Sequence, residues 1–186
     1  MKHFATLASV LYFAFCINML TAHAQKAGFQ SFPKYDVAVE CNCTLKPGRT
    51  MQQTIASAQW GKATTPAYPA NAYECMSSSG AEYKLEIEDQ RSKYNSMSLA
   101  DYQATVQTEL EELSLRYAKS GSTVRWIRIE GVSGVLVSFY FNNYATYSLQ
   151  FIKSGLVYRL NVSGDEVNGR KFESNMAAFI KSFKMI

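Results

Sequence analysis

The strongest constraint on the fold is a series of four segments, each alternating apolar and polar residues, that follow one another with almost no chain between them. They span residues 123–130, 134–142, 146–153 and 156–163. Alternation places every second side chain on the same face of a strand, so each segment is expected to be half-buried. Asn142-Asn143 and Ser154-Gly155 are tight-turn sequences. Because short turns join antiparallel strands, the segments predict an antiparallel meander that hides one face under helices.

Two amphipathic segments are expected to supply those helices. The first begins after Ser98, an N-cap with Asp101 three residues later, and continues to about residue 119. Its apolar stripe, at spacings of three and four, consists of Leu99, Tyr102, Val106, Leu110, Leu113 and Tyr117. The second helix covers about 168–184, and its stripe consists of Phe172, Met176, Phe179, Ile180 and Phe183. It is expected to close the core.

Further strands are expected before the first helix. They lie at 35–45, near 51–57, and in a hairpin of 72–76 and 82–89 whose second strand turns its charged side chains to water. A chain of 186 residues with 47% hydrophobic and 18% charged residues can bury one core without metals or many disulfides. The expected fold class is therefore α+β, an antiparallel sheet covered by helices, in a single domain of residues 34–186.

The first 24 residues have the layout of a signal peptide. A positive start precedes an apolar run, and Ala22 and Ala24 form an A-x-A site that favours cleavage after residue 24. An uncleaved membrane anchor is the alternative, since the run approaches spanning length. Residues 25–33 are expected to form a flexible lead-in. The sequence thus predicts export to the periplasm or the cell exterior, with no membrane span after cleavage.

Histidine is absent from the chain after the leader, because His3 and His23 both precede the cleavage site. This excludes Ser-His-Asp, Cys-His and histidine-ligated zinc chemistry. Phosphate-binding and dinucleotide-binding loops are missing, and the glycine-flanked segment 131–134 is expected to be a turn. No catalytic residue, cofactor or metal is predicted. A carboxylate-only hydrolase remains an alternative, with candidates Glu86, Glu88 and Glu130.

The charge pattern does not favour nucleic acid. The formal charge is +4, and loss of Lys2 with the leader lowers it to +3. The basic residues are scattered singly, apart from the adjacent pair Arg170-Lys171. No nucleic-acid partner is therefore expected.

Three cysteines follow the leader: Cys41, Cys43 and Cys75. An exported chain keeps disulfides, so one bridge is expected between Cys75 and either of the other two. Residues i and i+2 of a strand share a face, and the sequence leaves that choice open. Thiol redox chemistry and a three-thiolate metal site are the functional alternatives.

The order of strands, long helix, meander and final helix carries a resemblance. Gly155-Leu-Val-Tyr-Arg-Leu160 leads a strand, and the chain closes with Phe179-Ile-Lys-Ser-Phe-Lys184. This combination resembles the PsbP-like family, which includes the extrinsic photosystem II subunit and its bacterial relatives. The resemblance implies an α-β-α sandwich and an accessory, assembly or ligand-holding role, and it brings no shared catalytic constellation. The cysteines of the first strand and the proline-containing insertion depart from the family pattern.

A possible binding surface is expected from three aromatic residues and two arginines: Trp60, Tyr140, Tyr144, Arg125 and Arg128. Tyr140 lies on the alternation opposite to Phe139 and Phe141, which are expected inside. The predicted function is that of an exported, non-enzymatic accessory or partner-binding protein of the cell envelope. The alternative is a carrier of a small apolar ligand, with a pocket between sheet and helices. An exposed aromatic patch would favour the first function, and a cavity lined by tyrosine and phenylalanine the second.

Overall fold

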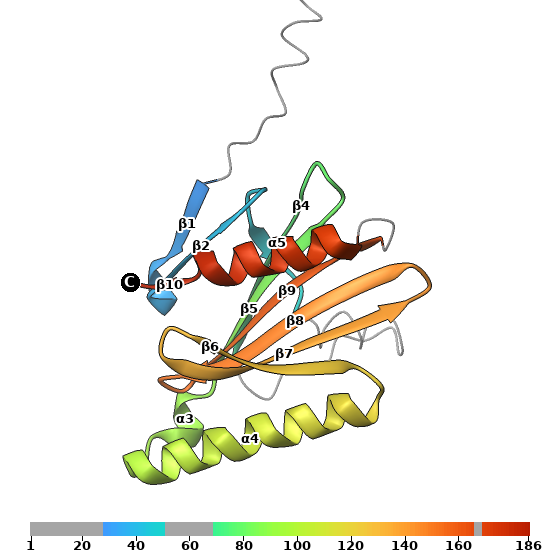
Figure 1. The fold of residues 1–186 in the computed structure, drawn as a ribbon. Coiled ribbons are helices and arrows are strands. Elements are labelled where there is room, and N and C mark those ends of the chain that lie inside the picture. The colour runs from blue at the N-terminus through green and yellow to red at the C-terminus, as the bar shows by residue number, and fades with distance from the viewer. Residues whose placement is uncertain (1–27, 51–68, 166–168) are drawn as a thin grey trace, which may run out of the picture.

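The computed structural model describes residues 28–50, 69–165 and 169–186. Its main element is a seven-stranded antiparallel sheet in the order β3-β4-β5-β9-β8-β7-β6 (Figure 1). Four strands that are consecutive in the chain form one side of it: β6 (Thr123–Ile129), β7 (Val132–Phe141), β8 (Tyr144–Lys153) and β9 (Leu156–Asp165). Each pairs antiparallel with the next. The predicted antiparallel meander is confirmed, and the described residues form a mixed α+β fold.

The turns of the meander each contain two residues. Asn142-Asn143 and Ser154-Gly155 have positive φ at both positions, as a tight hairpin requires. Glu130-Gly131 forms the third such turn, with φ of 48° and 81°. The predicted turn at 131–134 is therefore wrong beyond Gly131, because the following residues already belong to β7. Gly134 lies inside the strand, where a Cβ atom would come within 2.9 Å of a Leu149 methyl carbon.

The first predicted helix is confirmed as α4 (Leu99–Lys119), which follows the short helix α3 (Arg91–Tyr94). The Ser98 hydroxyl oxygen accepts a hydrogen bond from the backbone N–H of Asp101, as expected for an N-cap. Leu110 is buried against Val135 of the sheet. Leu99, however, is 72% exposed, because the first turn of α4 borders a surface groove. Its expected place in the buried stripe is wrong.

The second predicted helix is α5 (Gly169–Ser182), and it packs on the opposite face of the sheet from α4 (Figure 1). Leu136 belongs to the core cluster that contains the α5 side chains, whereas its neighbour Val135 contacts α4. Neighbouring residues of a strand point to opposite faces, so the two helices lie on different sides. Phe179 of α5 meets Tyr83 edge-on, with ring centroids 5.4 Å apart.

A smaller antiparallel sheet lies on the same side as α5. It contains β1 (Gly28–Phe32), β2 (Val37–Cys41) and β10 (Lys184–Met185), with β2 in the middle. A short 3-10 turn, η1 (Pro33–Tyr35), joins its first two strands. Five residues of β1 pair with β2, so the expected flexible lead-in is corrected from residue 28 onward. The strand expected at 35–45 is limited to β2.

The predicted hairpin before α4 is confirmed as β4 (Ala70–Met76) and β5 (Glu82–Asp89), and β3 (Lys46–Gly48) pairs with β4. The water-facing side expected for β5 is wrong in its centre, because Lys84 and Glu86 are buried. β5 lies inside the sheet between β4 and β9, and both charges have ion-pair partners. The strand expected near 51–57 lies outside the described residues. Within the described ranges, no helix has the length and apolarity to cross a bilayer.

Candidate functional site

Exposed aromatic side chains gather at the tip of the β7–β8 hairpin. The exposed fraction is 42% for Phe139, 51% for Tyr140, 70% for Phe141 and 39% for Tyr144. Phe141 lies directly opposite Tyr144 in the strand pair, and Phe139 is two residues away on the same strand. These three residues therefore share one face of the hairpin, and Tyr140 points to the other face. We name Phe139, Phe141 and Tyr144 the hairpin patch.

The hairpin patch is exposed because β7 extends beyond the strand beside it. β6 begins at Thr123, whose partner is Ser138, so later β7 residues have no neighbour on that side among the described strands. The prediction that Phe139 and Phe141 lie inside is therefore wrong. The sequence contains one signal for this exposure, the two-residue turn at Glu130-Gly131. If residues are paired outward from that turn, Thr123 at the start of β6 meets Ser138, so residues 139–141 of β7 extend beyond β6.

Both tyrosines expected at a binding surface are exposed, and their hydroxyl groups are held in place. The Tyr144 hydroxyl lies 3.2 Å from Oγ of Ser163, to which it donates a hydrogen bond. The Tyr140 and Tyr147 hydroxyl oxygens are 2.6 Å apart. Burial raises the pKa of Tyr147, so its hydroxyl stays protonated and available for this hydrogen bond. The exposed rings are thereby oriented, on opposite faces of one hairpin.

The two arginines expected at a binding surface both lie on β6, the last strand of the large sheet. Arg125 pairs with Glu173 of α5, with 2.9 Å between Nη2 and Oε1. Arg128 is exposed and lies three residues further along, so it points to the opposite face. The structure therefore places the two guanidinium groups on one edge but on different faces. Trp60, the remaining candidate, lies outside the described residues.

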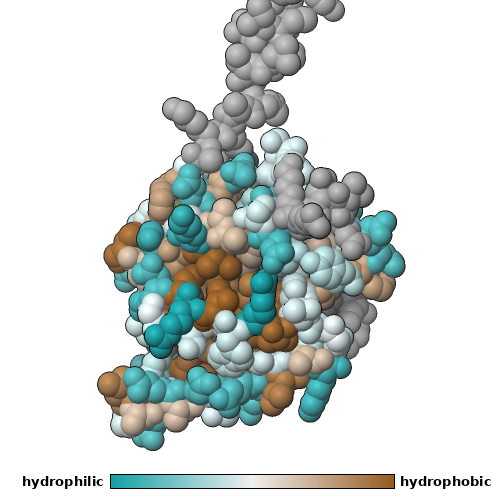
Figure 2. Space-filling model, viewed as in Figure 1, coloured by the Kyte–Doolittle hydropathy of each residue, from teal (hydrophilic) through white to brown (hydrophobic). Residues whose placement is uncertain are grey.

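A groove of about 430 Å³ lies between α5 and β6, and we name it the α5 groove. Figure 2 shows apolar side chains at the bottom of a hollow on this face, with hydrophilic side chains around it. Its aliphatic lining consists of Ile127, Leu136, Met176, Ala177 and Ile180. The charged lining consists of Arg125, Arg128, Glu173 and Lys181. The α5 groove can therefore accept an apolar side chain beside a charged one.

A second groove, of about 720 Å³, lies between α4 and the ends of the sheet strands, and we name it the α4 groove. Tyr94 and Tyr102 line it, with ring centroids 5.1 Å apart. Arg128 and Lys153 add positive charge. Many of the other described aromatic rings pack in the core, for example Phe151 against Phe183 with centroids 5.2 Å apart. The space expected for a carrier is thus a surface groove, mixed in polarity.

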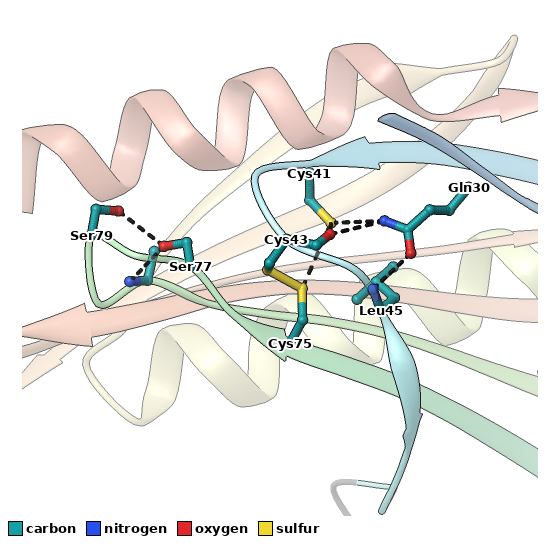
Figure 3. Close-up of a disulfide and its surroundings, with 8 residues drawn as sticks. Gln30, Cys41, Cys43, Leu45, Cys75, Ser77 and Ser79 are labelled. Atoms are coloured by element: carbon teal, nitrogen blue, oxygen red, sulfur yellow. Dashed lines mark hydrogen bonds between the residues drawn. A yellow bond between two sulfur atoms is a disulfide. The ribbon is translucent and has the colours of Figure 1, made fainter. Parts of the chain in front are cut away.

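The expected single disulfide is present, and it joins Cys43 to Cys75 (Figure 3). Cys43 follows β2 in the chain and Cys75 lies in β4, so the bond ties the segment after the small sheet to the large sheet. The sequence left open whether Cys41 or Cys43 pairs with Cys75, and in the structure the partner is Cys43. Sγ of Cys41, the other candidate, lies 3.8 Å from Sγ of Cys75 without a bond.

The Cys41 thiol is buried and hydrogen-bonded. It donates to the carbonyl oxygen of Cys43 over 3.0 Å. The Gln30 side-chain amide donates to the same carbonyl and accepts a hydrogen bond from the backbone N–H of Leu45 (Figure 3). Burial raises the pKa of Cys41, which keeps it a thiol at neutral pH. Cys43 and Cys75 are bonded to each other, so the three cysteines consist of one disulfide and one free thiol, that of Cys41, beside it.

Two of the three carboxylates considered for hydrolysis, Glu86 and Glu88, are held in an ion-pair network. Nη1 of Arg159 lies 2.8 Å from Oε1 of Glu86 and 2.9 Å from Oε2 of Glu88. Nε of Arg159 donates to Gln150. Glu130 is in the β6–β7 turn and does not join this group. One guanidinium therefore bridges two of the carboxylates, and the structure does not bring the three candidates together.

Comparison with known proteins identifies no family. No family model and no curated protein matches the sequence. Among solved structures, one match is a Pseudomonas aeruginosa protein of unknown function, which is 13% identical, with a TM-score of 0.35. That match covers 72% of this chain and 91% of the other.

Proposed function

We propose that this chain is an exported, non-enzymatic protein that binds another protein in the cell envelope or outside the cell. The observation that carries the proposal is the hairpin patch. Three large aromatic side chains project from one face of an ordered hairpin and stay accessible to solvent. Exposed aromatic residues are enriched among the side chains that dominate binding energy at protein interfaces.

The geometry of the hairpin suits a preformed binding surface. A two-residue turn at Asn142-Asn143 fixes the register, and eight residue pairs join β7 to β8. The Tyr144 ring is also tethered through its hydroxyl group. Binding to such a surface costs little conformational entropy, because the contact residues are already ordered.

Export is the second part of the proposal. It rests on the signal-like first 24 residues, and a disulfide is compatible with an oxidising compartment. We further propose that the layers form an α-β-α sandwich of the PsbP-like kind. Helices on both faces of an antiparallel sheet support that assignment.

The test is site-specific photo-crosslinking in the native host. A photoreactive phenylalanine analogue replaces Phe141 in one strain and Phe29 in a control strain. Phe29 is a matched control because it is also an exposed aromatic residue, 58% accessible, on β1 and far from the hairpin (Figure 1). We expect one protein adduct of defined mass from position 141 and none from position 29. Absence of an adduct at 141, or the same adducts at both positions, would contradict the proposal.

The carrier function remains the second candidate because of the α4 groove, which has the volume of a small-molecule site. Native mass spectrometry of the protein purified from its host separates the two functions. A retained small molecule would favour the carrier. A bare polypeptide beginning at residue 25 would favour protein binding and would also establish cleavage of the leader.

A further inference from the structure

β6 forms an open edge of the large sheet. It is the last strand in the order, with β7 on one side and no described strand on the other. None of its seven residues makes a further backbone–backbone hydrogen bond with the described parts of the chain. Its outward N–H and C=O groups are therefore available to pair with an added strand.

The charges of β6 disfavour a second copy of the same chain as that strand. The segment Thr123–Ile129 contains two arginines, Arg125 and Arg128, and no acidic residue. If two copies paired antiparallel with residue 125 or 128 at the centre, two identical arginines would lie directly opposite each other, and with residue 126 or 127 at the centre they would lie diagonally across the strand pair. Like charges directly opposite each other destabilise a strand pair. An incoming strand with acidic side chains would gain from the same arrangement.

The surroundings of β6 also select for apolar side chains on one face of the incoming strand. The α5 groove opens along β6, and its floor contains Ile127 and Ile180. Successive side chains of an added strand point to alternate faces, so every second one would lie over this groove. Trp126, which is 44% exposed, and Arg128 alternate with Ile127 along β6, so they point to the other face, although both also border the α5 groove. Alternating apolar and acidic residues would complement this edge.

We propose that β6 binds an extended acidic–apolar segment of a partner protein as an eighth strand of the sheet. Backbone hydrogen bonds supply the affinity, the α5 groove takes the apolar side chains on one face, and Arg128 favours acidic neighbours on the other face. This inference rests on the proposed protein-binding function and adds the kind of partner. It uses a surface different from the hairpin patch, so each can be tested alone.

The probe is a synthetic peptide of alternating glutamate and valine. The protein carries Trp60→Phe, which leaves Trp126 as its single tryptophan. We expect saturable binding in the Trp126 fluorescence and slower amide hydrogen exchange at residues 123–129. Two control peptides are used: one has lysine in place of glutamate, and the other is N-methylated at alternate residues to remove backbone donors. Neither control is expected to bind.

Two charge variants complete the test. Arg128→Glu is expected to weaken peptide binding by about tenfold or more. Arg116→Glu, an exposed site on α4 that lines none of the grooves described above, is expected to change it by less than about twofold. Equal binding of the N-methylated peptide, absence of any binding, or binding without slower exchange at 123–129 would overturn strand addition.

Failure of this inference can be distinguished from failure of the proposed function. If the peptide does not bind but the adduct at position 141 forms, strand addition is wrong and protein binding at the hairpin patch stands. Phe141→Ser is expected to leave peptide binding unchanged. A loss of peptide binding in this variant would mean that the peptide sits on the hairpin and would overturn strand addition.

Discussion

Replacing Cys75 by serine is expected to lower the free energy of unfolding by about 3–4 kcal/mol. The Cys43–Cys75 bond closes a loop between residues 32 positions apart, and loss of a cross-link over such a loop restores unfolded-state entropy of about this size. Cys43→Ser is expected to cost less than half as much after oxidative refolding. Its Cys41 thiol is already 3.8 Å from Sγ of Cys75 and can form the alternative bond over a similar loop.

Urea denaturation measures both losses, and mass spectrometry of the unreduced proteins counts the bonds. Cys43→Ser is expected to be two hydrogens lighter than its reduced form, with a Cys41–Cys75 peptide in the digest. Cys41→Ser is the control, because it removes the free thiol and keeps the Cys43–Cys75 disulfide. Equal destabilisation of the Cys43 and Cys75 variants, with two free thiols in Cys43→Ser, would contradict the idea that Cys41 is positioned to substitute.

Arg159→Met is expected to lower the free energy of unfolding by about 3–5 kcal/mol, because removing one partner of a buried ion pair leaves the other partner's charge uncompensated. The side chains of Glu86 and Glu88 are 4% and 14% exposed, and each forms an ion pair with the Arg159 guanidinium. Adding Glu86→Gln to this variant is expected to recover part of the loss, since one buried charge is then removed.

An exposed ion pair provides the matched control. Arg125 and Glu173 are 51% and 52% exposed, and Arg125→Met is expected to cost less than about 1 kcal/mol. Thermal or urea unfolding of the variants at neutral pH is the measurement. Two results would contradict this account: equal losses of unfolding free energy for Arg125→Met and Arg159→Met, or no recovery when Glu86→Gln is added to Arg159→Met. Either would show that burial of the charges around Arg159 does not set the cost of removing it.

Much of the fold could be predicted because local signals and tertiary packing agree. The two-residue turns at Asn142-Asn143 and Ser154-Gly155 and the Ser98 N-cap were all readable from short-range chemistry. The pairing of β1 with β2 could not be predicted. β1 (Gly28–Phe32) is short, has little alternation of apolar and polar residues, and is stabilised by its partner strand.

The candidate site was predicted less completely, since exposure depends on neighbouring layers. Periodicity assigned Phe139 and Phe141 to the face of β7 that packs under a helix, and that face is indeed buried at Val137. The same face becomes exposed at residues 139–141, beyond the end of β6 and the contact with α4. The alternation of residues within β7 alone carries no information about where its neighbours end. The buried state of Glu86 was missed for a similar reason, because its ion-pair partner, Arg159, lies on another strand.

The central claim, that the hairpin patch binds a protein, is tested most directly by the dissociation constant of the partner captured at position 141. Purified partner is titrated against the wild-type protein, Phe141→Ser and the control Phe29→Ser. Loss of an aromatic contact worth about 2 kcal/mol predicts roughly 30-fold weaker binding for Phe141→Ser and no change beyond about twofold for the control. Equal dissociation constants for all three proteins would contradict the claim.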